Sequence, residues 1–327
     1  MPLQREKSAS WFPAQGTAAK RPKSIYNSPK RMRITALFSL LLVVVFGAFF
    51  DNRPVELELI KALPVEERTE PSGLTIRDGR LFVVSDNDDQ TIYELHIRES
   101  AAVLEPHVRF NAPSLEGVRK LDFEGISQDK EGDFYLVSES TSRVLRVSKD
   151  GQKTEWVTPD LREEGRKKGL FQVNNGGLEG IACVSSRHFY LCAERQERGI
   201  IEFKTRGHQI STEVWNCEKR DWDPPYDRPA DFSDLFLDGN RLYALMRADE
   251  GIAEMGLDTD SFRAKRFWSF GRTVHDPAYS YRDATYGKAE GLCMDQKRIY
   301  VILDNNLDSR TNNAEDTRPL FFIFRRP

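Results

Sequence analysis

Seven carboxylates occupy two recurring positions in this sequence, and they are its clearest candidates for chemistry. At one position a glutamate stands directly before the glycine of a Glu-Gly-Ile or Glu-Gly-Leu triplet, as in Glu124, Glu179 and Glu290. At the other position an acid follows a short aromatic and aliphatic run, as in Asp86, Glu139, Glu194 and Asp304. Carboxylates that gather in one place repel one another, so at neutral pH they need a cation, hydrogen-bonded partners or shared protons. A hard cation with oxygen ligands, Ca2+ above all, meets that need directly.

The two acidic positions belong to a longer pattern that recurs five times. Each copy can be aligned on one aromatic residue, and these residues are 53, 55, 53 and 57 positions apart: Phe82, Tyr135, Tyr190, Tyr243 and Tyr300. Each copy holds two short apolar runs around a polar turn, such as residues 77–79, which is typical of a β-hairpin. Further short apolar runs follow the hairpins, and four strands in a repeat of this length indicate a β-propeller.

The fold expected from these repeats is an all-β propeller of five blades, with six blades as the alternative if a long loop hides a divergent copy. The fifth copy supplies only three strands before the sequence ends. Residues 55–60, in which apolar and acidic side chains alternate, are expected to add the missing fourth strand. Closing the ring in this way removes an exposed sheet edge that would invite aggregation.

The order of strands within a blade decides where the acids meet. In an antiparallel meander the start of the innermost strand and the end of the second strand lie on the same face, so all seven carboxylates are expected at one mouth of the central channel. Long loops over a rigid scaffold commonly carry function. The longest connecting segments open at this same mouth: residues 159–177, 217–229, 271–287 and 305–317. The structural alternative is that each Glu accepts backbone hydrogen bonds and pins one blade to the next.

The fourth copy departs from the pattern, because its two acidic positions hold Ser233 and Arg247. An arginine that faces carboxylates predicts a salt bridge. In the alternative interpretation Arg247 forms, together with Arg195 and Lys288, an edge that receives the phosphate or carboxylate of a substrate held against a metal.

Charge divides the chain into two unlike parts. The formal net charge is −3, from 48 basic and 51 acidic residues, but residues 1–50 hold eight basic residues and one acid. Residues 51–327 therefore hold 40 basic and 50 acidic residues. A domain this acidic repels phosphate backbones, which argues against a nucleic-acid partner.

The basic part ends in a segment without charges. Residues 34–50 read ITALFSLLLVVVFGAFF between Arg33 and Asp51, and a helix of this length measures roughly 25 Å, the short end of what a bilayer core requires. We therefore expect a basic, disordered cytoplasmic tail over residues 1–33, a transmembrane anchor over residues 34–50, and an exported propeller over residues 51–327 on the periplasmic or extracellular side. The alternative is a cleaved signal peptide.

Four cysteines stand at positions 183, 192, 217 and 293. An exported domain tolerates disulfides, and Cys183 and Cys192 flank the third hairpin turn about symmetrically. The sequence leaves two alternatives open for this pair, a disulfide across the hairpin or two buried thiols.

The repeated Glu-Gly-Ile/Leu, followed by an aromatic and aliphatic run and an acid, resembles the phytase-like ("esterase-like activity of phytase") and SdiA-regulated propeller families. Residues 174–182, NNGGLEGIA, and the later Ala193-Glu194-Arg195 carry the resemblance best. Similar short motifs occur in calcium-binding propellers that include lactonases and gluconolactonases. The resemblance implies that a Glu before Gly on an inner strand can hold a central metal ion.

The resemblance implies a propeller that binds Ca2+ and hydrolyses a phosphoester or an ester, and together with the charge pattern and the apolar segment it predicts a membrane-anchored, exported protein. The expected metal ligands are the three glutamates of the triplets and two of the acids that follow second strands: Glu124, Glu179, Glu290, Asp86 and Asp304. Glu139 or Glu194 is expected to act as the base, and Arg195, Arg247 and Lys288 to bind an anionic or other small-molecule substrate. The alternative function is a non-catalytic envelope scaffold or ligand-binding propeller, which would include a protein partner.

Overall fold

The computed structural model describes residues 54–66, 69–174, 176–218, 227–256, 264–283 and 287–327, all of which lie in one compact unit, Phe50–Pro327. The predicted tail and the predicted anchor, residues 1–33 and 34–50, lie outside the described residues. Among the residues that are described, no helix is both long enough and apolar enough to span a bilayer.

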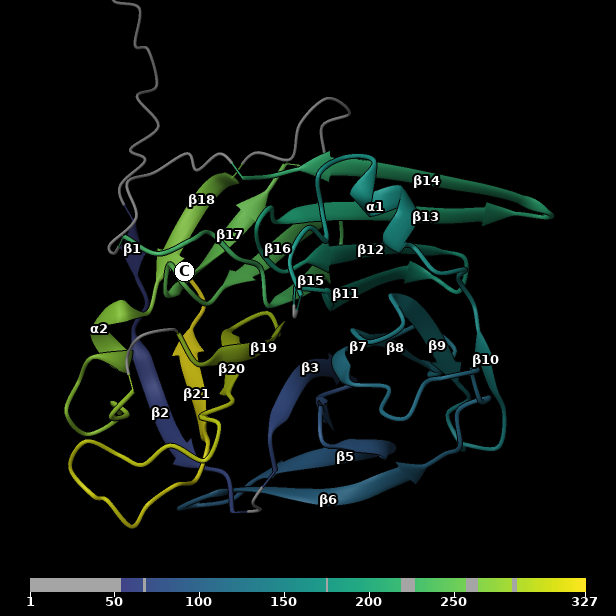
Figure 1. Ribbon diagram of the computed structural model, residues 1–327. Coiled ribbons are helices and arrows are strands. Elements are labelled where there is room, and N and C mark those ends of the chain that lie inside the picture. Colours follow the sequence, from purple (N-terminus) through teal and green to yellow (C-terminus); the bar gives the residue numbers. More distant parts are fainter. Residues whose placement is uncertain (1–53, 67–68, 175, 219–226, 257–263, 284–286) are drawn as a thin grey trace, which may run out of the picture. The chain divides into compact units, whose positions relative to one another are not determined.

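Five sheets, antiparallel except for one strand pair in blade 4, form the compact unit, which confirms the five-bladed propeller and not the six-bladed alternative (Figure 1). Blade 1 consists of β3 (Pro71–Arg77), β4 (Arg80–Ser85), β5 (Asp88–Ile97) and β6 (Ala102–Arg109). Blade 2 consists of β7 (Phe123–Gln128), β8 (Phe134–Ser138), β9 (Arg143–Val147) and β10 (Thr154–Trp156). Blade 3 consists of β11 (Leu178–Ser185), β12 (His188–Ala193), β13 (Gly199–Arg206) and β14 (Gln209–Asn216).

The last two blades include strands from the amino-terminal side of the domain. Blade 4 consists of β15 (Asp234–Asp238), β16 (Arg241–Met246), β17 (Gly251–Met255), β18 (Ala264–Ser269) and, paired in parallel with β18, β1 (Val55–Glu56). Blade 5 consists of β19 (Ala289–Met294), β20 (Arg298–Leu303), β21 (Leu320–Arg325) and β2 (Leu59–Pro64). Two short helices, α1 (Arg162–Arg166) and α2 (Gly271–Val274), lie in connections between blades.

An amino-terminal strand completes blade 5 as predicted, but its predicted position was wrong by four residues. The alternation of residues 55–60 suggested one strand, whereas the structure uses residues 59–64 to pair with β21 and gives Val55 and Glu56 to blade 4. Burial explains the shift, because Leu57 and Leu63 are buried while Val55 and Ile60 are half-exposed. Leu57 joins a cluster with Trp268 and Phe324, so this segment ties blade 4 to blade 5.

The inner strands β3, β7, β11, β15 and β19 contact one another in a ring around the channel axis. They approach so closely that a Cβ atom on Gly125 would lie 2.5 Å from the Glu179 carbonyl oxygen, and one on Gly180 would lie 2.5 Å from the Asp234 Cα. Real Cβ atoms do not make contacts this short. The glycine of the repeated Glu-Gly pair is therefore required by the packing of one blade against the next.

Asp234 occupies the glycine position of the fourth copy and places a fully buried carboxylate among the inner strands. Its Oδ1 accepts the Leu235 N–H at 2.8 Å and its Oδ2 accepts the Leu292 N–H at 2.8 Å. The amides of Leu74 and Ile181 also donate to this carboxylate. One side chain thus binds the inner strands of blades 1, 3, 4 and 5, and the sequence analysis missed it.

The hairpin turns and the cysteines also bear on the predictions. Asp78 and Gly79 both have positive φ, of 50° and 77°, as expected for a tight hairpin turn between β3 and β4.

All four cysteines are free thiols. Cys183 is opposite Phe189 in the β11–β12 register, and the Cys192 Sγ accepts the Gly180 N–H at 3.1 Å. Of the two alternatives for this pair, the disulfide across the hairpin was wrong.

We predict that Asp234→Asn destabilises the propeller by several kcal/mol. The amide nitrogen of asparagine cannot accept hydrogen bonds, so buried backbone N–H groups lose their acceptor at a cost of about 1–3 kcal/mol each. Urea unfolding of the purified protein measures the change. Asp78→Asn is the matched control, because this side chain is 87% exposed in a turn that asparagine tolerates. Equal midpoints for both variants would contradict the role of Asp234.

Candidate functional site

A cavity of about 670 Å3 lies at the mouth of the channel and brings together all ten residues that the sequence singled out. They are Asp86, Glu124, Glu139, Glu179, Glu194, Arg195, Arg247, Lys288, Glu290 and Asp304. The lining holds ten carboxyl groups and five cationic side chains in all. The predicted convergence of the repeated acids on one mouth is therefore what the structure shows.

The Glu-Gly pairs reach the mouth through irregularities in the strands. The register of the first and second strands shifts between Phe123 and Gly125 in blade 2, and between Ala289 and Gly291 in blade 5. Blade 3 has a shift that also spans its Glu-Gly pair. A β-bulge leaves one residue unpaired and re-aims its side chain. In blade 4, which lacks the Glu-Gly pair, β15 and β16 pair without a shift.

The second set of acids is held by one hydrogen bond that recurs from blade to blade. The Glu139 N–H donates to the Asp122 carbonyl oxygen at 2.9 Å, and the Asp304 N–H donates to the Lys288 carbonyl oxygen at 2.8 Å. Asp86 and Glu194 make the equivalent bonds to Glu70 and Gly177. In every case the acceptor lies two residues before the start of the repeated triplet, so the two acidic positions are held side by side.

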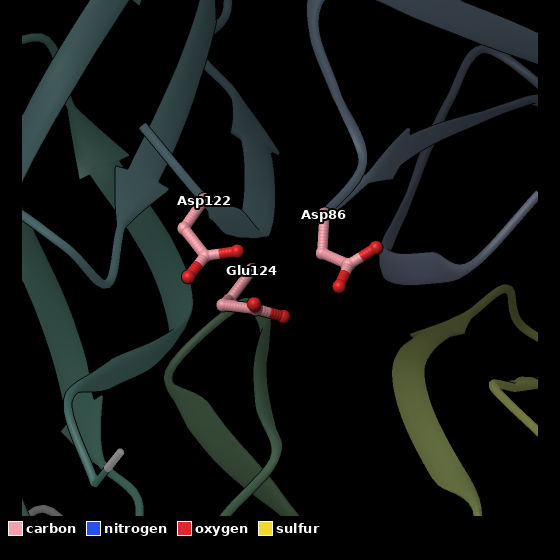
Figure 2. A group of neighbouring side chains, drawn as sticks. All are labelled: Asp86, Asp122 and Glu124. Carbon is pink, nitrogen blue, oxygen red and sulfur yellow. The ribbon is translucent and has the colours of Figure 1, made fainter. Parts of the chain in front are cut away.

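Asp86, Asp122 and Glu124 form a first acidic group, in which one carboxylate oxygen of each residue lies within 4.8 Å of the others. Figure 2 shows that the three side chains converge from two blades, Asp86 from one and Asp122 and Glu124 from the other. Burial raises the pKa of Asp86 to about 7, against the opposing charge of Lys120. Burial and the charges of Glu290 and Asp86 raise the pKa of Glu124 well above its usual range.

Two observations bear on whether this first acidic group fits a hard cation. The Asp86 Oδ1 is buried and has no hydrogen-bond partner among the described residues. The Lys120 Nζ lies 2.5 Å from the Asp122 Oδ1 and 3.7 Å from the Asp86 Oδ2, but its side chain is 53% exposed and sits at the edge of the group. An all-oxygen donor set with an unused buried oxygen is the kind of site that a hard divalent cation takes. The residues present therefore fit a divalent cation.

Glu139, Glu179 and Glu194 form a second acidic group with the same spacing. The Glu139 Oε1 accepts the Gly177 N–H at 3.1 Å, and the Glu139 carboxyl group also shares a hydrogen bond with Asp122. Burial and the charges of Asp122 and Glu194 raise the pKa of Glu139 to about 7. Glu139 thus connects the second acidic group to the first.

Arg247 lies between three carboxylates. It forms salt bridges with Glu290, with Glu194 and, at 3.2 Å, with Asp231. Arg195 forms a further salt bridge with Glu194. The predicted salt bridge of Arg247 is confirmed, and it occupies Glu194 and Glu290 more fully than the sequence suggested. The substrate-binding roles of Arg195, Arg247 and Lys288 stay predictions.

The sequence analysis missed three acids of the cavity: Asp283, which lies between α2 and β19, and two that belong to the repeat, Asp122 and Asp231. Both stand two residues before the start of an inner-strand triplet, and Glu70 holds the same place in blade 1. A third recurring acidic position was therefore present in the repeat. It went unnoticed because in blades 3 and 5 the equivalent residues are Gly177 and Lys288.

We predict that the metal-free protein becomes less stable as pH rises from about 5 to about 8. Burial raises the pKa of Asp304 to about 6 and that of Glu290 to about 8, although the Asn306 amide and Arg247 respectively oppose these shifts. In the unfolded chain both carboxyl groups ionise near pH 4. Between that pH and its raised pKa in the folded state, each group binds more protons in the folded state than in the unfolded state, so the free energy of unfolding falls as pH rises.

Urea unfolding in a chelator across this pH range tests the prediction. Asp304→Asn should flatten the curve between pH 4 and pH 6 relative to the unaltered protein. Asp295→Asn is the control, because hydrogen bonds from Lys297 and Tyr300 outweigh burial and lower the pKa of that carboxyl, which moves its contribution below pH 4. A free energy of unfolding that stays level or rises from pH 5 to pH 8 is the contrary result.

Comparison with known proteins gives one family and a set of distant structural neighbours. The sequence model of the family described as "Phytase-like: Esterase-like activity of phytase" matches residues 70–307. No curated protein matches the sequence.

Among solved structures, selenomethionine-substituted virginiamycin B lyase from Staphylococcus aureus is 9% identical, with a TM-score of 0.42 over 82% of this chain and 99% of that chain. The PQQ-bound aldose sugar dehydrogenase from Streptomyces coelicolor is 10% identical, with a TM-score of 0.46 over 83% and 98%. The gluconolactonase XC5397 from Xanthomonas campestris is 12% identical, with a TM-score of 0.42 over 78% and 72%.

Proposed function

The chain belongs to the phytase-like family, and we propose that the acidic cavity of its propeller binds Ca2+ and hydrolyses a phosphoester or an ester there. The observation that carries the proposal is the first acidic group, with three carboxylate oxygens within 4.8 Å of one another and a buried Asp86 oxygen that lacks a partner among the described residues. Like charges brought this close are costly unless a cation or protons compensate them.

The geometry ranks the residues that the sequence offered as ligands. Asp86 and Glu124 lie in the first acidic group with Asp122, and they are the ligands we favour. Glu179 lies in the second acidic group. Glu290 is bound by Arg247, and the Asp304 Oδ1 accepts the Asn306 N–H at 2.8 Å, so both already have protein partners.

Two carboxylates near the cation site, Glu139 and Glu194, are the candidates for the general base. A bound cation would polarise a substrate oxygen and lower the pKa of a water molecule. Glu139 is the better placed of the two predicted bases, because the Gly177 amide orients it beside Asp122 and no arginine binds it among the described contacts. Burial raises the pKa of Glu194, but Arg247 and Arg195 both bind this carboxylate and oppose the rise, so Glu194 is a weaker base than burial alone would make it.

Export of the propeller would suit such a site. We propose that residues 34–50 anchor the chain in a membrane, with the basic tail of residues 1–33 in the cytoplasm and the propeller on the periplasmic or extracellular side. Extracellular calcium modules commonly work with dissociation constants of about 10⁻⁴–10⁻³ M. A site with three carboxylates and a neighbouring lysine belongs in that weak range.

We predict that Ca2+ raises the melting temperature of the purified full-length protein relative to the protein in chelator. A hundredfold excess over the dissociation constant adds about 2.7 kcal/mol of stability. Glu124→Gln should abolish the increase, since it replaces a carboxylate ligand with a neutral amide and removes one negative charge from the site. Glu131→Gln, an exposed glutamate at the far end of the same β7–β8 hairpin, should keep it. A melting temperature indifferent to Ca2+, or an increase that survives Glu124→Gln, would rule out this site.

Hydrolysis is tested separately with chromogenic phosphoester and ester substrates in the presence of Ca2+. We expect turnover that chelator abolishes and that Glu139→Gln lowers by about 10²–10⁴-fold, the usual contribution of a general base. Glu131→Gln should retain full activity. If Ca2+ stabilises the protein but neither substrate class turns over, the non-catalytic scaffold or ligand-binding propeller becomes the better account.

A further inference from the structure

A second cavity, of about 380 Å3, lies beside the acidic mouth and differs from it in charge. It is lined by two arginines of α1, by two serines of the β8–β9 turn, and by the segment that leads into β11. Its charged side chains are Arg162, Arg166 and Glu139, so cations outnumber carboxylates. Glu139 also lines the acidic cavity, and the two cavities therefore share one wall.

The two arginines are fixed in place by backbone oxygens. The Arg162 Nη2 donates to the Ser140 carbonyl oxygen at 3.0 Å, and the Arg166 Nε donates to the Phe171 carbonyl oxygen at 3.4 Å. The only carboxylate paired with Arg162 among the described residues is Asp160, at 3.7 Å. A guanidinium group carries five N–H donors in a planar fork that matches phosphate and carboxylate oxygens. Each arginine thus retains donor capacity toward the cavity.

Ser142 gives an independent sign that a ligand belongs here. The residue is 1% exposed and lines the cavity, and its Oγ is buried without a hydrogen-bond partner among the described residues. Its backbone has a positive φ of 50° and its carbonyl oxygen accepts the Leu161 N–H at 3.0 Å, so the backbone of Ser142 is held against the start of α1. A buried hydroxyl without a partner is costly, and an oxygen-bearing ligand would satisfy it.

We propose that this cavity binds an oxyanion group, phosphate or carboxylate, of the molecule whose scissile bond is received at the acidic mouth. The inference rests on the proposed function for the position of the bond, and it narrows the substrate class to esters or phosphoesters that carry a further anionic group. The carboxylates of the acidic mouth repel an anion, whereas Arg162 and Arg166 attract one across the Glu139 wall.

Binding of inorganic phosphate and of acetate to the full-length protein tests the proposal by isothermal titration. The titrations contain chelator, so that no anion binds through a metal ion. We expect phosphate to bind the unaltered protein, and the double variant Arg162→Gln/Arg166→Gln to raise its dissociation constant at least tenfold. Lys167→Gln is the matched control: it removes one positive charge next to α1 from a residue that does not line the cavity, and it should bind phosphate normally. Acetate shows whether a carboxylate satisfies the same site.

Ser142→Ala provides a second measurement that does not depend on the double variant folding. Because the hydroxyl has no partner to lose among the described residues, the melting temperature without phosphate should stay within 1–2 °C of the unaltered protein, while the dissociation constant for phosphate rises about threefold or more. A Ser142→Ala protein that binds both anions normally, or an unaltered protein that binds neither, would overturn the proposal.

The two proposals can fail separately. Failure of Ca2+ to stabilise the protein removes the cation site and leaves the result in chelator unaffected. Equal phosphate binding by the unaltered protein and the double variant removes the oxyanion cavity, even if Ca2+ binds as expected.

Discussion

The structure depends on how closely five inner strands approach one axis. Only glycine fits at contacts such as those of Gly125 and Gly180, and backbone N–H groups of four inner strands point into one buried space among these strands. The Asp234 carboxylate fills that space and accepts amides from four of the five blades. Buried polar groups are tolerated when all of them are paired, and here one side chain pairs several at once. The fourth copy, which departs from the repeat, therefore ties the inner strands of blades 1, 3 and 5 to its own.

The acidic mouth follows from the same constraint. Because glycine is required at the axis, the residue before it sits at a break in strand pairing, and its side chain is free to turn toward the mouth. The backbone bond from Glu139 to Asp122, with its equivalents in the other blades, then places a second acid beside the first. Protein cations compensate only part of this charge. Arg247 forms salt bridges with Glu194, Asp231 and Glu290, whereas burial and neighbouring carboxylates raise the pKa of Glu124 and, against the charge of Arg247, that of Glu179.

Much of this arrangement was predictable from the repeat. The spacing of the aromatic residues predicted the blades, and the strand order predicted that the seven repeated acids meet at one mouth, where the structure places them. The sequence did not predict the start of β2, because alternation alone does not show that Leu57 packs against Trp268. It also missed Asp234 and Asp122. Asp122 was missed because its recurring position is acidic in only three of the five copies. The roles of Asp234 and Arg162 depend on contacts between separate segments, which no pattern within a single copy contains.

The closure of blade 5 makes folding a long-range event. Arg325 and Glu58 form a salt bridge across the β21–β2 junction although 267 residues separate them in the chain. A contact of this separation carries a large loop-closure entropy, so it forms late and slowly. Until then β21 and β18 present unpaired edges, which other chains can bind. The interval before closure is therefore the period in which the chain is most exposed to aggregation and proteolysis.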